Sequence, residues 1–225
     1  MDDLFALLSG NPVFAQLDAA GRSLLAGRGI TRRYRKGEII TLLGDIWPYF
    51  FMVGKGCVHA VKESAEGRRL IVTALEPGDI LWGMAFFLPK APMPVTLTAH
   101  EACCITVWDR EFLAPLFIAN GTSLWELSCL MVDRMQHASG LVDNLAFHTV
   151  TGRVARIVLD RFGRSAGTPV ARDMTLEEMA AMVGTTREVV CRTLYRLAEE
   201  EIIQITRTEF ILTDKEALEG LAAGG

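Results

Sequence analysis

The chain lacks a basic leader, a long apolar run and an excess of positive charge. Its first residues, Met1 to Phe5, are acidic where a secretory signal is basic, and Gly, Pro or charged residues interrupt every apolar run before about 18 residues. We therefore expect a cytoplasmic protein without a membrane segment. The net charge of -4 excludes a general nucleic-acid coating protein, so any affinity for DNA must come from a local patch.

The sequence also lacks paired cysteines. Its five cysteines, Cys57, Cys103, Cys104, Cys129 and Cys191, form no Cys-x-x-Cys pair and have no His at zinc-finger spacing. This excludes a structural zinc site, and in a reducing cytosol we expect mostly buried thiols. Cys191 carries a second hypothesis, a redox switch, because it directly precedes Arg192 in a segment with DNA-binding features.

No nucleophile elbow, phosphate loop, metal-spaced His/Glu pair or acid/base couple is present. This favours a protein that is not an enzyme, although a small-molecule carrier or an enzyme stays open as an alternative. The 225 residues, half of them hydrophobic, suit one or two domains.

The segment from Met174 to Ile202 predicts two helices joined by a tight turn at Gly184. Thr175 with Glu178, and Thr185 with Glu188, have the spacing of capping boxes at the two helix starts. The second helix is expected to direct Val189, Leu194 and Leu197 toward a core and to leave its charged residues accessible, as a helix in a major groove requires.

Two β-rich runs around a polar turn follow, from Ile202 to Thr213, and predict the wing of a winged helix-turn-helix. An ordinary helical hairpin is the alternative, but two capping boxes, a glycine turn and an arginine-rich helix favour DNA binding. The predicted DNA-binding residues are Thr185, Thr186, Arg187, Glu188, Arg192, Arg196 and Arg207.

The first half of the chain has short runs of β-forming residues separated by Gly or Pro, which predict an antiparallel barrel or sandwich. Short helical pieces are expected before it, at Asn11 to Phe14 and Asp18 to Leu25. The predicted strands are 39–43, 49–53, 57–61, 70–75, 95–99 and 103–108.

A helix is predicted between the two halves. Asp109 caps a first short stretch, Asn120 and Gly121 end it, and Ser123 with Glu126 forms a capping box for a segment reaching about His148. Spacings of three and four predict a seam of coiled-coil type in a parallel homodimer, although packing on its own domain is the alternative. The seam residues are Leu124, Leu127, Met131, Arg134, Ala138, Leu141, Leu145 and His148.

This order of parts resembles the CRP/FNR family of bacterial transcription regulators over nearly the whole chain. Tyr34-Arg-Lys-Gly-Glu-Ile-Ile, Glu76-Pro-Gly-Asp-Ile and Thr185-Thr-Arg-Glu-Val-Val-Cys-Arg resemble its signatures, although Cys191 stands where serine or glycine is usual. The resemblance implies an α+β protein: an antiparallel β-roll (a double-stranded β-helix, cyclic-nucleotide-binding-like) over residues 1–110, a linker and dimerisation helix over 111–148, and a winged helix-turn-helix over 149–225.

By the same resemblance, Arg187 and Arg192 pair with guanine and Glu188 accepts from cytosine in a TGTGA-like inverted repeat. The implied partners are double-stranded DNA, a second copy of the chain and RNA polymerase. A two-state dimer, in which an effector changes how the long helices meet, is the expected mechanism. Arg134 and His148 are candidate switch positions, although a role in helix register or simple exposure is the alternative.

The effector region departs from the cyclic-nucleotide binders of the family. They hold ribose and phosphate with a Gly-Glu and an Arg-Ser or Arg-Thr, but between Asp79 and Glu101 this chain has no carboxylate and no arginine. Met93 and Pro94 stand in the place of the phosphate-holding pair, and Lys90 is a poor substitute for a bidentate arginine. Cyclic AMP and cyclic GMP are therefore not expected.

Other family sensors use an iron-sulfur cluster or haem. The amino terminus lacks Cys, which argues against a cluster. Haem is an open alternative, with His59, His100, His137, His148 and Met84 as candidate ligands.

An apolar pocket for an uncharged or aromatic effector is the main hypothesis, and plain core packing is its competitor. A regulator that needs no effector is also open. The candidate pocket residues are Trp82, Met84, Phe86, Phe87, Met93, Val95, Leu127 and Met131.

Overall fold

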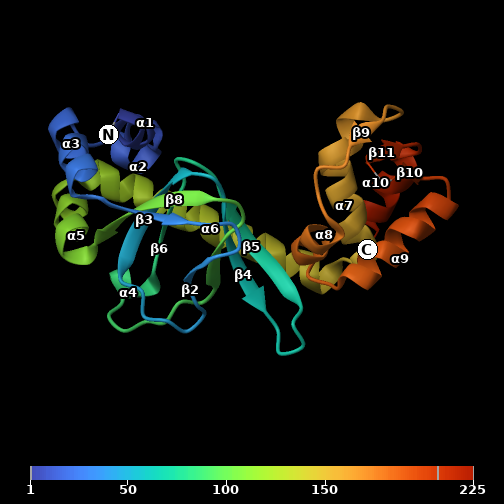
Figure 1. Ribbon diagram of the computed structural model, residues 1–225, viewed down its shortest axis with the longest axis horizontal. Coiled ribbons are helices and arrows are strands. Elements are labelled where there is room, and N and C mark those ends of the chain that lie inside the picture. Colours follow the sequence, from blue (N-terminus) through green and yellow to red (C-terminus); the bar gives the residue numbers. More distant parts are fainter. Residues whose placement is uncertain (1, 207, 225) are drawn as a thin grey trace. The chain divides into compact units, whose positions relative to one another are not determined.

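The computed structural model describes residues 2–206 and 208–224 (Figure 1). The chain divides into two units, residues 1–62 with 72–136 and residues 63–71 with 137–225. The boundaries predicted after residues 110 and 148 stay predictions, although helix α5 begins at Arg110 and helix α6 ends at Phe147.

The first unit is built on two four-stranded antiparallel sheets, ordered β1-β8-β3-β6 and β2-β7-β4-β5. The predicted strands are confirmed with shifts at their ends. Strands β1 and β6 are not among the predicted strands, and Trp82 of β6 was predicted to line a pocket. The strands are β1 (Ile30–Tyr34), β2 (Ile39–Thr41), β3 (Tyr49–Lys55), β4 (Val58–Glu63), β5 (Arg69–Leu75), β6 (Ile80–Trp82), β7 (Thr96–Ala99) and β8 (Cys103–Asp109).

Strand β3 separates two apolar cores. Successive side chains of a strand point to opposite faces, so Phe51 and Val53 pack between the two sheets while Phe50 and Met52 pack toward the helices. All four side chains are fully buried. Two-sided burial explains why this strand is a continuous apolar run instead of an alternating one.

The helices of the first unit begin where polar side chains cap them. Asn11 Oδ1 accepts a hydrogen bond from the backbone N–H of Val13, and Asp18 and Asp109 cap α3 and α5 in the same way. Of these caps, Asp109 was predicted from the sequence. Helix α1 was not predicted. The helices are α1 (Asp2–Gly10), α2 (Pro12–Ala15), α3 (Ala19–Arg28), α4 (Met84–Phe87), α5 (Arg110–Ala119) and α6 (Gly121–Phe147).

The predicted start of α6 was wrong. Asn120, not Ser123, is the capping residue, because its Oδ1 accepts the backbone N–H of Ser123 at 2.9 Å. Ser123 is fully buried inside the helix, and its hydroxyl donates to the carbonyl oxygen of Val13. Its polarity therefore ties α6 to the amino-terminal helices.

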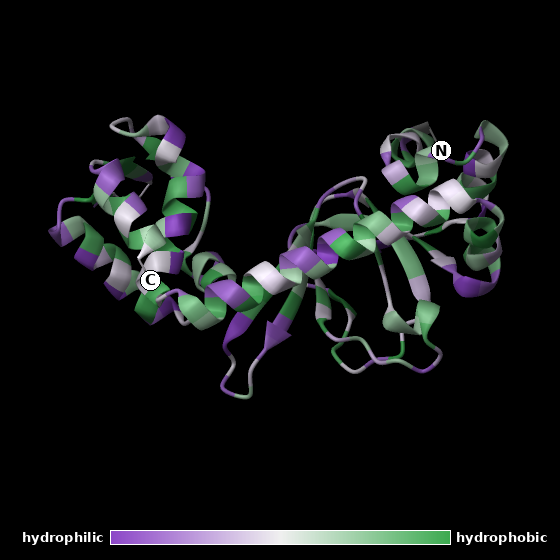
Figure 2. Ribbon diagram, turned by 180° about the vertical axis from the view of Figure 1, so that it is seen from behind, coloured by the Kyte–Doolittle hydropathy of each residue, from purple (hydrophilic) through white to green (hydrophobic). Residues whose placement is uncertain are grey.

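The predicted seam along α6 is partly covered by contacts within the chain, whereas its residues Leu124, Ala138 and Leu145 are exposed. Leu127 is 1% exposed and packs with Met131 in the helix-side core of its own unit, and Arg134 donates to the Thr73 hydroxyl at 3.0 Å. These positions are occupied by intramolecular contacts, as the alternative of packing on its own domain held. Figure 2 shows apolar and polar bands alternating along the rest of this helix.

The second unit has a single core with helices on one side and a small sheet on the other. The predicted wing is confirmed as an antiparallel β10-β11 pair, to which an unpredicted short strand adds in the order β10-β11-β9. Its elements are α7 (Val150–Phe162), the 3-10 turn η1 (Gly163–Ser165), β9 (Val170–Ala171), α8 (Leu176–Val183), α9 (Arg187–Glu199), β10 (Ile203–Ile205), β11 (Glu209–Leu212) and α10 (Lys215–Ala223).

The cysteines only partly follow the expectation of buried thiols. Cys57 and Cys103 are buried, Cys104 and Cys191 are half-buried, and Cys129 is exposed. Burial, reinforced by the nearby carboxylate of Glu76, raises the pKa of Cys57 to about 12, and burial also raises the pKa of Cys103. These two thiols stay protonated at neutral pH, which excludes them as nucleophiles.

A close backbone approach makes Gly83 a sensitive position. A Cβ added there would lie 1.7 Å from the carbonyl oxygen of Trp47, so Gly83→Ala is expected to lower the free energy of unfolding by about 3 kcal/mol or more. Urea unfolding followed by circular dichroism measures the change. Gly27→Ala is the matched control, because Gly27 lies in α3 with open space around its Cβ position and should gain about 0.5 to 1 kcal/mol. Similar stabilities of the two variants would contradict the Gly83 packing.

Candidate nucleic-acid interface

Helix α8 begins with the predicted capping box. Thr175 Oγ1 accepts the backbone N–H of Glu178 at 3.1 Å, and Glu178 Oε2 accepts the backbone N–H of Thr175 at 2.7 Å. Gly184 ends the helix in the left-handed conformation at φ 71°, where a side chain is unfavourable. The chain then turns directly into α9, so the two predicted helices and their turn are confirmed.

The second predicted capping box was wrong. The residue before α9 is Thr186 and its side chain caps no backbone N–H. The carboxylate of Glu188 instead bonds its own backbone N–H and the Thr186 hydroxyl, and these bonds lower its pKa. Glu188 is therefore ionised at neutral pH and acts only as an acceptor.

The buried face of α9 also differs by one residue from the prediction. Val190, Leu194 and Leu197 are buried in the core of the second unit, whereas Val189 is half-buried. Positions 190, 194 and 197 lie on one face at spacings of four and three, whereas position 189 lies about 100° away from position 190 around the helix. The opposite face is left to polar side chains.

The arginines of α9 differ in their partners. Arg187 Nε lies 3.0 Å from Glu177 Oε1, but both side chains are more than half exposed, so the ion pair is weak. Arg192 is exposed and forms no ion pair or hydrogen bond with the residues that the structure describes. Arg196 donates to the Thr151 hydroxyl at 2.6 Å and lies 3.9 Å from Glu200. Arg187 and Arg192 are thus free to meet a ligand, and Arg196 is partly engaged.

The remaining predicted residues lie at the two ends of this surface. Thr185 and Thr186 are half-buried in the turn before α9. The wing turn is closed by Thr206, whose backbone N–H donates to Glu209 and whose hydroxyl accepts the N–H of Glu209. Arg207 lies outside the described residues.

Sequence reasoning missed helix α7, which supports the hairpin from behind. Its signal was the apolar spacing of Val154, Ala155, Val158 and Phe162, all buried. Arg153 on this helix donates to the carbonyl oxygens of Asn144 and His148 and so caps the carboxyl end of α6. Burial lowers the pKa of Arg153.

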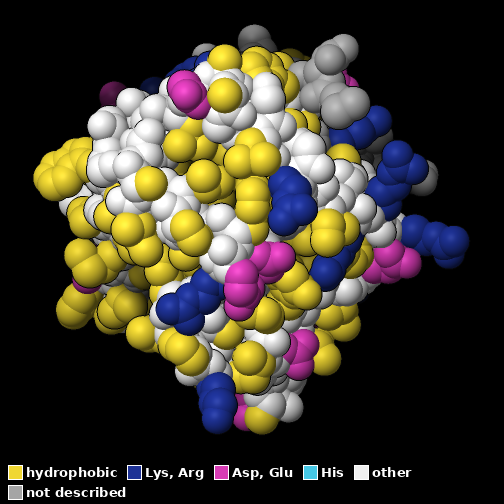
Figure 3. Space-filling model, turned by 90° about the vertical axis from the view of Figure 1, so that its left-hand side faces the viewer, with side chains coloured by type: hydrophobic (Ala, Val, Ile, Leu, Met, Phe, Trp, Pro, Cys, Tyr) yellow, Lys and Arg dark blue, Asp and Glu magenta, His cyan; other side chains and the backbone are white. Residues whose placement is uncertain are grey.

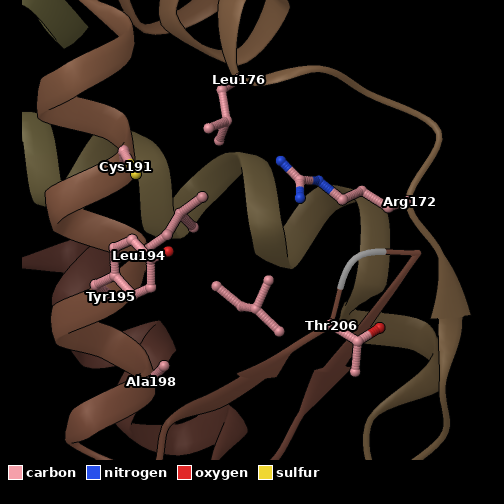
Figure 4. Close-up of a pocket in the computed structure, with 8 residues that line it drawn as sticks. Arg172, Leu176, Cys191, Leu194, Tyr195, Ala198 and Thr206 are labelled. Carbon is pink, nitrogen blue, oxygen red and sulfur yellow. The ribbon is translucent and has the colours of Figure 1, made fainter.

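Cys191 lies on the flank of α9 that faces the wing. It lines a cavity of about 340 Å³ with residues of α8, α9 and the wing (Figure 4). A modification of this thiol therefore places bulk between the helix and the wing, whereas the sequence-based hypothesis placed it against DNA.

The candidate effector residues do not surround one space. Trp82, Phe86 and Leu127 are buried in the helix-side core, with Met84, Phe87 and Met131 packed against it. Met93 and Val95 belong to the other core, between the two sheets. Phe50 stacks on Trp82 with ring centroids 5.7 Å apart. This packing agrees with the competing interpretation of these residues as core.

The candidate haem ligands are dispersed. His59 on β4 and His100 after β7 stack with ring centroids 4.1 Å apart, while His137 and His148 lie on and just after α6. None of these, nor Met84, lines any of three cavities found among residues 2–206 and 208–224. Within the same residues, no group of three or more His, Cys, Asp or Glu could hold a metal ion.

The end of the molecule that carries α3 and α5 shows apolar side chains with scattered charges of both signs (Figure 3). Leu24 and Ile118 are among the exposed apolar residues there. A phosphate backbone needs a basic face, so this end is unsuited to DNA. No helix in the described part of the chain is long and apolar enough to cross a membrane.

Comparison with known proteins agrees with this geometry. The Crp-like helix-turn-helix domain model matches residues 152–221, and the cyclic nucleotide-binding domain model matches residues 31–120. The chain is 25% identical to the Cyclic AMP receptor protein of Thermus thermophilus over 222 residues, covering 96% of this chain and 99% of that one. It is 28% identical to the cAMP-activated global transcriptional regulator Vfr of Pseudomonas aeruginosa, covering 77% and 85%.

Among solved structures, the c-di-GMP responsive global regulator CLP of Xanthomonas campestris has the same fold. The TM-score is 0.74 at 22% identity, and the match covers 87% of this chain and 99% of that one. The α+β fold, a sheet domain followed by a helix-turn-helix, is thereby confirmed.

The cap of α8 gives a direct test. Thr175→Ala removes the hydroxyl that accepts the Glu178 N–H and donates to the Glu178 carboxylate, while the backbone N–H of residue 175 keeps its bond to Glu178, and the variant is expected to lower the free energy of unfolding by about 1 kcal/mol. Thr185→Ala is the control, since the Thr185 hydroxyl has no hydrogen-bond partner among the described residues, and its loss should be smaller. Urea unfolding measures both variants, and equal losses would contradict the assignment of the caps.

Proposed function

Because the chain belongs to the CRP/FNR family of bacterial transcription regulators, we propose that it binds a TGTGA-like inverted repeat as a homodimer and controls transcription. The observation that carries the proposal is the exposed amino-terminal half of α9, on which Arg187, Glu188 and Arg192 project from a helix held by the core. We assign its site of action to the cytoplasm.

We assign base recognition to these three side chains. A guanidinium donates two parallel hydrogen bonds to guanine, and an ionised carboxylate accepts from the cytosine amino group. The lowered pKa of Glu188 keeps the carboxylate in the accepting form at neutral pH. Arg187 exchanges its exposed contact with Glu177 for a base at little cost.

The other predicted DNA-binding residues are assigned to the phosphate backbone. Arg196 lies nine residues beyond Arg187 on the same helix, about 14 Å along the axis, so the two do not reach one base pair together. Thr185 and Thr186 lie at the amino end of α9, where backbone N–H groups favour a phosphate. Arg207 is assigned to the wing contact from its sequence position alone.

The dimer seam is proposed on a stripe of α6 that its own unit leaves exposed. Trp125, Val132, Met135 and Val142 are 50 to 68% exposed, and with Ser128 and Ser139 they repeat at spacings of three and four. The stripe is the predicted seam moved by one residue, about 100° around the helix. A second copy that packs its own stripe here covers these apolar side chains.

We propose that the effector is not cyclic AMP or cyclic GMP. Met93, in the place of the phosphate-holding pair, is 2% exposed between the two sheets, and Val95 is buried beside it. Lys90 is exposed on the surface. Lys90 is the one Lys or Arg between Asp79 and Glu101, so this segment supplies no buried cation to offset the desolvation of a phosphate against Met93 and Val95. We therefore do not propose for this chain the activation by cyclic AMP that the names of its relatives state.

An uncharged or aromatic effector is the class that the apolar residues of the first unit accept, and it has to displace packed side chains such as Phe50 and Trp82 to enter. RNA polymerase is the proposed protein partner, because transcription regulators of this family act on it. The activity is regulatory and not enzymatic.

Operator binding tests the proposed function. Arg192→Ala is expected to weaken binding to a TGTGA inverted-repeat duplex by about 5- to 150-fold and to abolish the preference for its guanine. Fluorescence anisotropy with the matched and a guanine-substituted duplex measures both effects. Arg164→Ala is the control, since it removes an equal charge from an exposed position in η1. If both variants lost the same DNA affinity, Arg192 would contribute only its positive charge and would not recognise a base.

The dimer seam is tested by one charge on each side of α6. Met135→Glu places a carboxylate on the exposed stripe and is expected to shift the protein from dimer to monomer in sedimentation equilibrium. His137→Glu adds the same charge at an exposed position on the other side of the helix and should leave the dimer intact. A Met135→Glu protein that stays dimeric would contradict the proposed seam.

A further inference from the structure

The second unit contains a cavity that DNA recognition does not use. It has a volume of about 340 Å³, within the range of small-molecule sites, and lies between α9 and the wing (Figure 4). Its lining combines apolar side chains with polar ones. The apolar part is formed by Leu176 of α8, Leu194 and Ala198 of α9, and Ile205 of β10, and the rest by Arg172, Cys191, Tyr195 and Thr206.

Among the described residues that line this cavity, Arg172 is the one cation. Arg172 follows β9, where its backbone N–H donates to the carbonyl oxygen of Thr208 at 2.8 Å, and its guanidinium points into the cavity in Figure 4. The side chain is half-buried and approaches the Phe210 ring at 5.5 Å. Its guanidinium has neither ion pair nor hydrogen bond to any residue in the described ranges 2–206 and 208–224.

This arrangement leaves one interaction unmade. The contact with an aromatic face attracts the cation but does not neutralise it, and the guanidinium donors find no acceptor among the described residues. A carboxylate matches a guanidinium with two parallel hydrogen bonds, while the apolar side chains of the lining can contact the rest of a bound molecule.

We propose that this cavity binds a small aromatic or aliphatic carboxylate, with its anionic end on Arg172 and its apolar body against Leu194, Ala198 and Ile205. The cavity volume limits the ligand to about the size of one or two rings. Cys191, on the wall formed by α9, then lies beside the bound ligand.

Such a ligand also affects DNA binding, a step that rests on the proposed function. The cavity is shared by the recognition helix and the wing, and a bound carboxylate cancels one positive charge beside them. Loss of one cation near the phosphate backbone lowers DNA affinity several-fold at moderate salt. The cavity therefore provides an inhibitory input inside the DNA-binding unit.

The test uses 1-naphthoate and its uncharged analogue 1-naphthylmethanol with the full-length protein. Isothermal titration calorimetry is expected to show one site per chain for naphthoate and at least tenfold weaker binding of the alcohol. Arg172→Gln should remove the tenfold preference, leaving the two compounds equal, whereas Arg164→Gln should retain it. An equal affinity of wild type for both compounds would overturn the proposal.

The alkylation rate of Cys191 by iodoacetamide locates the ligand. Naphthoate is expected to slow labelling of Cys191 at least fivefold in wild type and to leave the exposed Cys129 unchanged. Naphthoate binding without protection of Cys191 would place the ligand elsewhere and overturn the proposal.

Operator binding separates this inference from the proposed function. Naphthoate should weaken operator binding several-fold in wild type and not in Arg172→Gln. If wild type binds no operator but naphthoate still depends on Arg172 and protects Cys191, the ligand site stands and the proposed function fails. If Arg172→Gln weakens operator binding and leaves naphthoate binding unchanged, Arg172 is a phosphate contact and the ligand site fails.

Discussion

Helix α6 has two apolar faces, and both have to be covered. The packing of the first unit and the proposed dimer depend on this constraint. One face is buried in its own unit through Ser123, Leu127 and Met131. A second face, about 100° around the helix, keeps Val132 and Met135 at least half exposed. A helix buried on one side only would have a polar outer face, so the second stripe indicates a second partner.

The two ends of α6 are held by different means. At the amino end, the Asn120 side chain caps the helix and the Ser123 hydroxyl bonds to Val13. At the carboxyl end, Arg153 donates to the carbonyl oxygens of Asn144 and His148. Each end of α6 is therefore joined to its own unit by buried or half-buried hydrogen bonds. These bonds fix which residues of α6 face the core at each end. In the proposed dimer, the exposed stripes of the two α6 helices pack against each other. A change in that packing is passed on to α7 through the hydrogen bonds of Arg153.

Much of the fold was predictable because local signals determine it. The caps at Asp109 and Thr175 and the turn at Gly184 need only neighbours in sequence, and all three are confirmed. The buried face of α9 could also have been read from spacing. Val190 lies four residues before Leu194, as two neighbours on one helix face do, whereas the predicted Val189 lies five residues before it.

The seam of α6, in contrast, could not be assigned from sequence. Both the predicted residues and the exposed stripe have spacings of three and four, one residue apart, and only contact with the rest of the unit shows which set is already covered. Packing of the eight candidate effector residues likewise depends on which sheet face each side chain takes. Met93 and Trp82 fall on different sides of the first sheet, so one pocket was predicted from residues of two cores.

Two sites for a small molecule are considered, the core between the sheets of the first unit and the cavity beside α9. They differ in whether a cation is present. The core between the sheets of the first unit is apolar, so it discriminates against an anion through desolvation. The cavity beside α9 has the opposite property, because Arg172 supplies a charge that no described residue of the unit neutralises. A ligand that lowers DNA affinity must by linkage bind less tightly to the DNA complex, so operator sites and the carboxylate compete for the same protein without sharing a single contact. This competition requires no movement between the two units, since the recognition helix and the wing belong to one of them.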